Sequence, residues 1–421
     1  MVHNAASDAT CVEVVSAFLE RVAKTEPNLH SFRQINAEVL YREAAALDAL
    51  PADQRGPLHG ELVAIKEVLD VAGYTCGWGT EIHASRQPKR DSFAVQILRS
   101  AGAIIAGITV STEYAMSAVG PTVNPFDPTR SPGASSQGSA AAVGSGLVDM
   151  SLGSQTIGSI IRPASYCGCI GFKPTWGAID VRGCMPLSTL LDHVGFFAAD
   201  PDRALALLKL LAPDLSLSQT GPKKVTVLAP WYDAPTSPEM TAAVDAAIAV
   251  LANQGMDIQS KSMPGWIVDT EVEILDTILA YGMAQYHGDD FDTHADHMTG
   301  RIKDYILRGR DIDLGMYEKA LAKREDMIDE LQTSLDGGVA IMPSASGVAT
   351  LSVDGTGPRD PQRLWTLVGF PAASIPTATS NGLPLGIQAI ALPSRDHDII
   401  KIARALLTST YDIFPASTQV S

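Results

Sequence analysis

The segment from Ser131 to Pro174 reads SPGASSQGSAAAVGSGLVDMSLGSQTIGSIIRPASYCGCIGFKP. Glycine and serine are frequent in it, but small apolar residues alternate with them, which a flexible linker would not need. Glycines at this density let backbone N–H groups approach a ligand closely, and the serines between them are candidate nucleophiles. We therefore expect the chemistry of this protein in a packed, glycine-rich segment.

Around this segment the apolar pattern predicts alternating helices and strands. Residues 62–65 form a short apolar run that predicts a buried strand ending at Lys66, and an amphipathic stretch at 93–100 precedes a second apolar run at 103–110. Residues 137–149 indicate a helix of small residues, and 153–159 a tight loop. At the N-terminus the spacing predicts a helix over 8–27, capped by Ser7 or Asp8. This order is typical of an α/β protein.

The middle of the chain, about 213–335, differs from its surroundings. Five prolines interrupt its start, and two long polar stretches at 240–254 and 271–286 predict helices that could cover the core as a lobe. Short apolar runs return at 338–343, 372–375 and 385–392. We expect one large domain over residues 1–421, with a helical middle section.

Composition limits the classes of function. The 421 residues are 46% hydrophobic, and 31 basic against 47 acidic residues give a net charge of −16, which argues against nucleic acid or an anionic membrane surface as a partner. The five cysteines are scattered without a CxxC pair, so neither a disulfide framework nor a thiolate zinc site is indicated. The N-terminus lacks the pattern of a secretory signal, and apolar runs are too short for a bilayer. We expect a cytoplasmic protein.

Short motifs then follow one another in a recognisable order. They are VAIKE at 63–67, AGAIIAG at 101–107, NPFDP at 124–128, PGASS at 132–136, GSQTIGS at 153–159, RPA at 162–164, GFKPT at 171–175, GFP at 369–371 and GLPLGIQ at 382–388. In this order the chain resembles the amidase signature family of serine hydrolases over most of 55–200 and 339–405. The resemblance implies a central mixed β-sheet with helices on both faces, no cofactor and no metal, and a homodimer.

The resemblance also implies a catalytic triad of two serines and a lysine. It places the nucleophile at Ser159, the bridging serine at Ser135 after a cis peptide bond, and the base at Lys66. The assignment of Lys66 as the base is chemically reasonable. A lysine removes a serine proton only when it is neutral, and burial at the end of an apolar strand lowers the pKa of an amine. An acyl-enzyme would form and then be hydrolysed.

Backbone N–H groups of Thr156, Ile157, Gly158 and Ser159 are expected to form the oxyanion hole. The family usually has glycine where this chain has Ile157. Because a β-branched residue does not adopt a positive φ cheaply, the loop is expected to be strained or reshaped if that angle is needed at 157.

Two residues are predicted to bind the substrate. Arg162 stands three places after Ser159, an order similar to that of bacterial malonamidases, where the arginine binds the carboxylate of the substrate. This favours a small amide bearing a carboxylate, such as malonamate; the alternative is a structural ion pair. Gln155 is placed to reach the substrate amide or the oxyanion, or else to brace the loop. Hydrolysis of neutral alkyl, aryl or carbamate-type amides and of esters stays open.

Other polar residues of the segment have simpler interpretations. Ser136 and Ser139 are expected to hydrogen-bond around the loop, Asp192 to brace a loop or cap a helix, and Lys173 to be structural rather than a second base.

Two rival functions come from different classes. The stretch HGDDFDTHADH at 287–297 holds three histidines and four aspartates, with His294 and His297 one helical turn apart, and could ligate zinc or manganese in a metallohydrolase. The second rival is the amidase subunit of a tRNA-dependent amidotransferase, which shares the triad but works with a partner.

Overall fold

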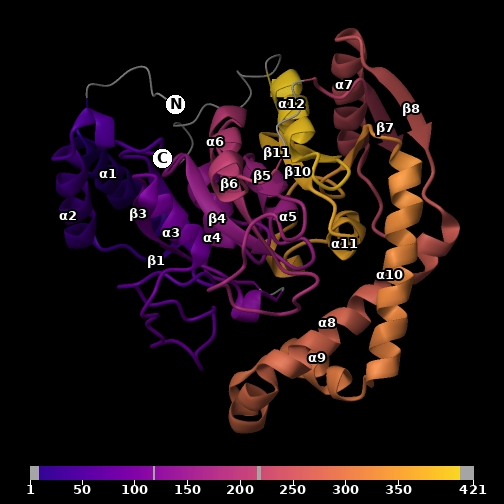
Figure 1. Cartoon of the computed structure of the whole chain (residues 1–421), viewed down its shortest axis with the longest axis horizontal. Coiled ribbons are helices and arrows are strands. Elements are labelled where there is room, and N and C mark those ends of the chain that lie inside the picture. Colours follow the sequence, from indigo (N-terminus) through magenta and orange to yellow (C-terminus); the bar gives the residue numbers. More distant parts are fainter. Residues whose placement is uncertain (1–8, 117–118, 216–219, 408–421) are drawn as a thin grey trace.

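The computed structural model describes residues 9–116, 119–215 and 220–407 (Figure 1). Within them one sheet of eleven strands runs through the molecule in the order β1-β3-β2-β4-β6-β5-β10-β11-β9-β7-β8. The strands are β1 Phe32–Gln34, β2 Leu62–Lys66, β3 Ile104–Thr109, β4 Met150–Gln155, β5 Ile170–Lys173, β6 His193–Ala198, β7 Lys224–Leu228, β8 Asp257–Lys261, β9 Val339–Pro343, β10 Ala372–Ser380 and β11 Leu383–Ile390.

The sheet is mixed. Strands β3, β2 and β4 are parallel to one another, as are β9, β7 and β8, while the strands between these groups pair antiparallel. The chain is therefore a single α/β domain with a large mixed sheet flanked by helices, which confirms the predicted fold class.

Helices cover both faces of this sheet. They are α1 Cys11–Leu29, α2 Ala37–Asp48, α3 Phe93–Ser100, α4 Gln137–Gly144, α5 Ile161–Cys167, α6 Pro201–Leu211, α7 Pro238–Asn253, α8 Gly265–His294, α9 Gly300–Arg310, α10 Leu314–Leu335, α11 Asp360–Leu367 and α12 Asp396–Leu407, with short 3₁₀ helices η1 Ala52–Gln54, η2 Glu113–Ala115, η3 Ala295–His297 and η4 Ser352–Asp354. One core contains apolar residues of α3, α6, α7 and α12, and another those of α1, α2 and α4.

Strand β2 shows how this arrangement positions a functional side chain. Successive side chains of a strand point to opposite faces, and Val63 and Ile65 join the core of α3 and α6, whereas Leu62 and Ala64 join the core of α1 and α4. Lys66 has the parity of Leu62 and Ala64. It therefore lies on the α4 side of the sheet, where the glycine- and serine-rich segment packs.

The predicted elements of the N-terminal half were largely correct. β2, β3 and α3 occur where the apolar runs and the amphipathic stretch predicted them. The predicted helix over 8–27 is α1, whose first turn is capped by the side chain of Thr10, while Ser7 and Asp8 lie outside the described residues. The predicted loop at 153–159 was wrong at its start, because residues 153–155 continue β4 between β2 and β6.

The middle section is not only helical. It contributes β7 and β8, which extend the sheet at its far end, and β8 is the edge strand. The long helices α8 and α10 pack together with α9 and extend away from the sheet (Figure 1). Their inner side chains share a core with Trp365 of α11 and Met342 of β9, so this helical part is anchored to the sheet.

Two further features follow from the described residues. None of their helices combines the length and the apolar character that crossing a bilayer requires. All five cysteines are free thiols.

Candidate active site

Lys66 lies at the carboxyl end of β2 with its side chain completely buried. Its Nζ is 2.7 Å from Ser135 Oγ and 3.0 Å from Ser154 Oγ, so the amine contacts two hydroxyl groups. Burial lowers the pKa of Lys66 to about 7, because a charged ammonium is poorly solvated there. A large fraction of the lysine is therefore neutral near neutral pH and able to accept a proton.

Ser135 immediately precedes the first turn of α4, and the peptide bond between Ala134 and Ser135 is cis, as the resemblance predicted. Its carbonyl oxygen accepts a hydrogen bond from the backbone N–H of Thr112. The side chain is 1% exposed. The hydroxyl is thus held beside Lys66 on the buried side of the segment.

Ser154, the second partner of Lys66, was missed by the sequence analysis. It lies on β4, which pairs parallel to β2. The sequence pattern contains no signal for that pairing, because residues 153–155 resembled a loop. Only the strand order brings Ser154 to the lysine.

Ser159 lies in the loop between β4 and α5, and its side chain is half-buried. It lines a narrow pocket with seven other residues: Ala115, Met116, Thr156, Ile157, Leu187, Leu279 and Arg359. The free volume is about 10 Å³, the room for one water molecule, so an acyl group fits only when these side chains rearrange. No hydrogen bond joins Ser159 to Ser135 in the described residues; catalytic hydrogen bonds often tighten only when substrate binds.

The loop around Ser159 offers unpaired backbone donors. Within the described chain no acceptor is recorded for the N–H groups of Ile157, Gly158 and Ser159, and Ile157 is absent from the residues with positive φ. The strain that was considered for Ile157 is therefore not present. A Cβ on Gly158 would lie 2.5 Å from Gln362 Oε1, so a larger residue there would have to displace the end of that side chain.

Thr156, also predicted for the oxyanion hole, has a structural contact of its own. Its Oγ1 donates to Asp192 Oδ1 over 2.6 Å, and Asp192 Oδ2 accepts the N–H groups of Leu187 and Ser188. Burial raises the pKa of Asp192 to about 6. Asp192 thus braces the loop, as one interpretation of the sequence held.

Of the two roles expected for Gln155, the contacts in this structure are those of a loop brace. Its side chain is 1% exposed, its Oε1 accepts the N–H groups of Ile160 and Ile161, and its Nε2 donates to Thr366 Oγ1 over 2.9 Å. Thr366 in turn donates to the carbonyl of Ile157. With every polar atom engaged, Gln155 is a brace that fixes both ends of the nucleophile loop.

Arg162 also differs from its prediction. Its guanidinium is buried in α5, and it donates to the carbonyl oxygens of Gly357 and Ala134 over 2.7 Å and of Pro358 over 3.3 Å. Burial lowers the pKa of Arg162 to about 10. Neither a substrate carboxylate nor the alternative structural ion pair accounts for this geometry, because the partners are neutral carbonyl groups.

The remaining polar residues have structural contacts, as expected. Ser136 Oγ donates to the carbonyl of Ser154, and Ser139 Oγ to that of Leu152. Lys173 Nζ donates to the carbonyl of Phe370 over 2.6 Å. These contacts bind α4 and β5 to the elements around the site.

The histidine-rich stretch does not assemble into a metal site. His287 Nε2 is 2.7 Å from the carbonyl of Pro186, His294 ends α8, and His297 lies in the separate short helix η3. In the part of the chain that the structure describes, no group of three or more His, Cys, Asp or Glu side chains is arranged to hold an ion.

The chain is similar to several known proteins in sequence and in fold. A family model described as Amidase matches residues 13–333. A glutamyl-tRNA(Gln) amidotransferase subunit from Synechococcus sp. (strain RCC307) is 30% identical over 453 aligned residues, which cover 94% of this chain and 93% of the relative.

Two solved structures are similar over their full length. One is described as "Crystal structure of amidase"; it is 26% identical, with a TM-score of 0.86 and coverage of 95% of this chain and 96% of its own. The other, described as "An unexpected vestigial protein complex reveals the evolutionary origins of an s-triazine catabolic enzyme", is 25% identical, with a TM-score of 0.87 and coverage of 96% of both chains.

Proposed function

The chain belongs to the amidase family of amide C–N hydrolases, and we propose that it cleaves a small amide through an acyl-enzyme on Ser159, with Ser135 as the bridging serine and Lys66 as the base. The observation that carries this proposal is the buried contact of 2.7 Å between Lys66 Nζ and Ser135 Oγ. A lysine whose pKa lies near 7 exchanges a proton with a hydroxyl at that distance without a metal.

The first half of the reaction forms the acyl-enzyme. Ser159 Oγ attacks the amide carbonyl carbon while its proton passes to Ser135, and the proton of Ser135 passes to Lys66 Nζ. The carbonyl oxygen becomes an anion that the free N–H groups of Ile157, Gly158 and Ser159 are placed to receive, with Thr156 contributing from the loop start. The C–N bond then breaks, and the proton returns through Ser135 to the departing ammonia or amine.

The second half releases the acid. A water molecule attacks the ester carbonyl of acylated Ser159, and Lys66 again accepts a proton through Ser135. The C–O bond to Ser159 breaks, the serine recovers its proton, and the carboxylic acid leaves. Every proton in this sequence is exchanged among the substrate, water and the three side chains.

For the substrate we propose an amide that bears a carboxylate, such as malonamate. The order of Ser159 and Arg162 resembles that of malonamidases, but both terminal nitrogens of Arg162 already donate to backbone carbonyl groups, and only its buried Nε has no partner in the described chain. The support comes instead from Arg359, the one charged residue among the described residues that line the pocket beside Ser159.

A second candidate comes from the relative in Synechococcus. If residues 1–421 act as the amidase subunit of a tRNA-dependent amidotransferase, the same triad would release ammonia for a partner, and nucleic acid would enter the reaction through that partner. The two candidates share the first half-reaction and differ in the fate of the ammonia.

Ammonia release tests the proposal. Purified wild-type chain and Ser159→Ala are incubated with malonamate, its neutral counterpart malonamide, and aryl amides; Ser145→Ala, on the far end of α4, is the matched control. We expect release by wild type and by the control, and none by Ser159→Ala. Release by Ser159→Ala at the wild-type rate would remove the nucleophile assignment, and no release from any free amide would favour the amidotransferase role.

A further inference from the structure

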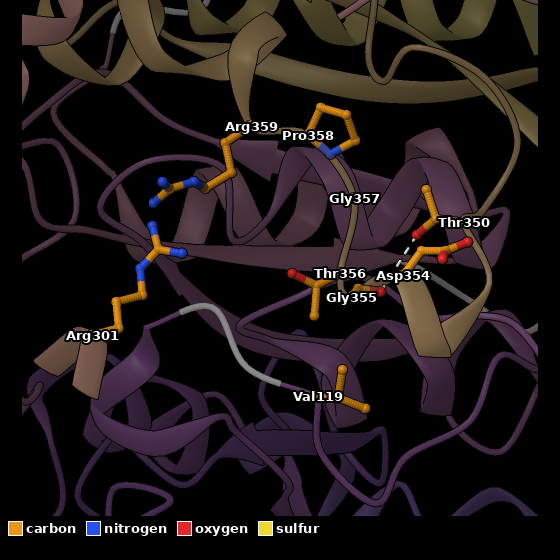
Figure 2. A pocket seen from close by; sticks show the side chains of 9 residues that line it. All are labelled: Val119, Arg301, Thr350, Asp354, Gly355, Thr356, Gly357, Pro358 and Arg359. Carbon is orange, nitrogen blue, oxygen red and sulfur yellow. Dashed lines mark hydrogen bonds between the residues drawn. The ribbon is translucent and has the colours of Figure 1, made fainter. Parts of the chain in front are cut away.

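A cavity of about 480 Å³ opens next to the pocket of Ser159 (Figure 2). Arg301, in the first turn of α9, and Arg359, immediately before α11, line one end of it. Figure 2 shows the two guanidinium groups turned toward one another, with Asp354 at the opposite end. Two segments almost sixty residues apart thus bring like charges together in one hollow.

These two arginines lack the counter-charges that others have. Half-buried Arg203 pairs with Asp149 and Asp200, and Arg363 pairs with Asp360. For Arg301 and Arg359 no ion pair is recorded within the described residues.

The surroundings of the pair do not neutralise it. Arg301 Nε is buried without a hydrogen-bond partner in the described chain. Asp276, which attracts Arg359, already accepts the hydroxyl of Tyr305 over 2.8 Å and lies 3.6 Å from Arg308. Burial, and then the charge of Arg301, lowers the pKa of Arg359. Arg301 and Arg359 are both half-buried, so their like charges repel one another through partly desolvated surroundings, and an anion between them relieves the repulsion.

Arg359 connects this cavity to the nucleophile. It lines the large cavity with Arg301 and also the narrow pocket with Ser159. An anionic group held at Arg359 is therefore held beside the pocket that Ser159 lines.

We propose that Arg301 and Arg359 form the subsite that binds the carboxylate of the amide substrate, in the role that the sequence had indicated for Arg162. The proposal rests on the amidase function proposed above and specifies its substrate class. Planar guanidinium groups suit a carboxylate because each offers two parallel N–H donors. Specificity for acid-bearing amides then comes from the middle section and the segment before α11.

Binding without turnover tests the subsite by itself. Calorimetric titration of Ser159→Ala with malonate is compared with the same titration of Ser159→Ala carrying Arg359→Gln, Arg301→Gln or, as the control on α9, Arg310→Gln, whose ion pair is with Asp292. We expect each subsite variant to bind malonate about tenfold more weakly or worse, the loss of one charged hydrogen bond, and the control to bind normally. Binding should also weaken as salt is raised.

Equal affinity for malonate in all four proteins would overturn the proposal. Inorganic phosphate is titrated in parallel, and tighter binding of phosphate than of malonate would contradict a carboxylate subsite. Thermal unfolding of each variant shows whether it is folded. Arg301→Gln and Arg359→Gln are separate single-site tests of the subsite, so if one variant misfolds, the other still tests the proposal.

Turnover separates this proposal from the proposed function. With Ser159 intact, the ratio of kcat/KM for malonamate to that for malonamide is expected to fall about tenfold in Arg359→Gln. An unchanged ratio in an active enzyme would refute the subsite and leave the amidase function standing. The opposite result is also informative. If malonate binding depends on both arginines but the chain cleaves no amide, the subsite is supported and the amidase function is refuted.

Discussion

Lys66 illustrates how one residue is prepared by its surroundings. The strand that carries it is buried over its full length, so the amine reaches two serine hydroxyls and no solvent. Removing an ammonium from water lowers its pKa, and here the value falls to about 7. Because burial disfavours the protonated form of Lys66, the neutral amine is available as a base.

The pH dependence of the reaction follows from this value. Lys66 accepts a proton only when neutral, so kcat/KM is expected to rise with pH through about 7 and to level off above it. Malonamide is the substrate to use, because it does not titrate in this range. A rising limb near pH 10 instead would show that the lysine is not held neutral. Asp192→Asn is the control, since the pKa of Asp192 lies near 6.

Side chains of the triad should not contribute equally. We expect Lys66→Ala to lower kcat by more than Ser135→Ala, because a bridging hydroxyl can be replaced by water whereas the base cannot. Steady-state kinetics on one amide measures both variants. Near-native activity of Lys66→Ala would show that another group is the base.

Arg162 is expected to act on stability rather than on specificity. Arg162→Leu removes the donor from the buried carbonyl group of Ala134 and from the part-buried carbonyl groups of Gly357 and Pro358; an unsatisfied group costs about 1–3 kcal/mol when buried, and less where water reaches it. Denaturant unfolding should show a loss of about 2–5 kcal/mol. The ratio of activity on malonamate to that on malonamide should stay constant. A selective loss of activity on malonamate would show that Arg162 binds the substrate carboxylate.

At the scale of elements, the loop between β4 and α5 determines the geometry of the nucleophile. It has no regular structure of its own, and its shape depends on contacts from both sides: Gln155 binds the N–H groups at its end, and Thr366 of α11 binds the carbonyl of Ile157. The oxyanion donors are thus held by one chain of hydrogen bonds that crosses from β4 to α11.

Breaking this series of hydrogen bonds should lower the rate of the reaction and leave substrate binding nearly unchanged. In Gln155→Leu we expect kcat to fall about 10–100-fold, less than the roughly 100–1,000-fold that follows removal of an oxyanion donor, because the donors are displaced and not lost, while KM changes by less than about threefold. Thr366→Val, which removes only the far contact, should lose less. An unchanged kcat in Gln155→Leu would mean that the loop keeps its shape without the brace.

The elements that sequence predicts well are those whose signal is local. β2 and β3 are apolar runs because both of their faces are covered, and α3 carries its apolar residues on one side. β8 was missed because it is an edge strand with the sequence DIQSK, most of which is partly exposed, so it has no apolar run. Its pairing with β7 holds it as a strand. The end of β4 was also missed because it has no apolar run: its residues are small and polar, and pairing with the neighbouring strands holds them in the sheet.

At the scale of the molecule, the site is assembled from distant parts of the chain. Lys66, Ser135 and Ser159 belong to the motifs that resemble the amidase signature family, so the sequence was enough to propose them. Arg301 and Arg359 lie in α9 and before α11, outside those motifs, and only the packing of the middle section against the core brings them together. Residues that act through long-range packing leave no local signal to read.

Whether the chain works by itself is also a property of the molecule. If it hydrolyses free amides as proposed, ammonia release by the purified chain should be unaffected by ribonuclease treatment and by added tRNA. Activity that appears only with tRNA or a further protein would favour the amidotransferase role. The homodimer implied by the family resemblance stays a prediction, which light scattering after size-exclusion chromatography measures.

The central claim is that Ser159, activated through Ser135 by neutral Lys66, carries the acyl group. Rapid quenching after mixing with p-nitrophenyl acetate, followed by mass spectrometry of the intact chain and its peptides, measures this directly. We expect an acetyl group on Ser159 in the wild type, none in Ser159→Ala, and much slower acetylation in Lys66→Ala. An adduct on another residue, or one that forms as fast without Lys66, would contradict it.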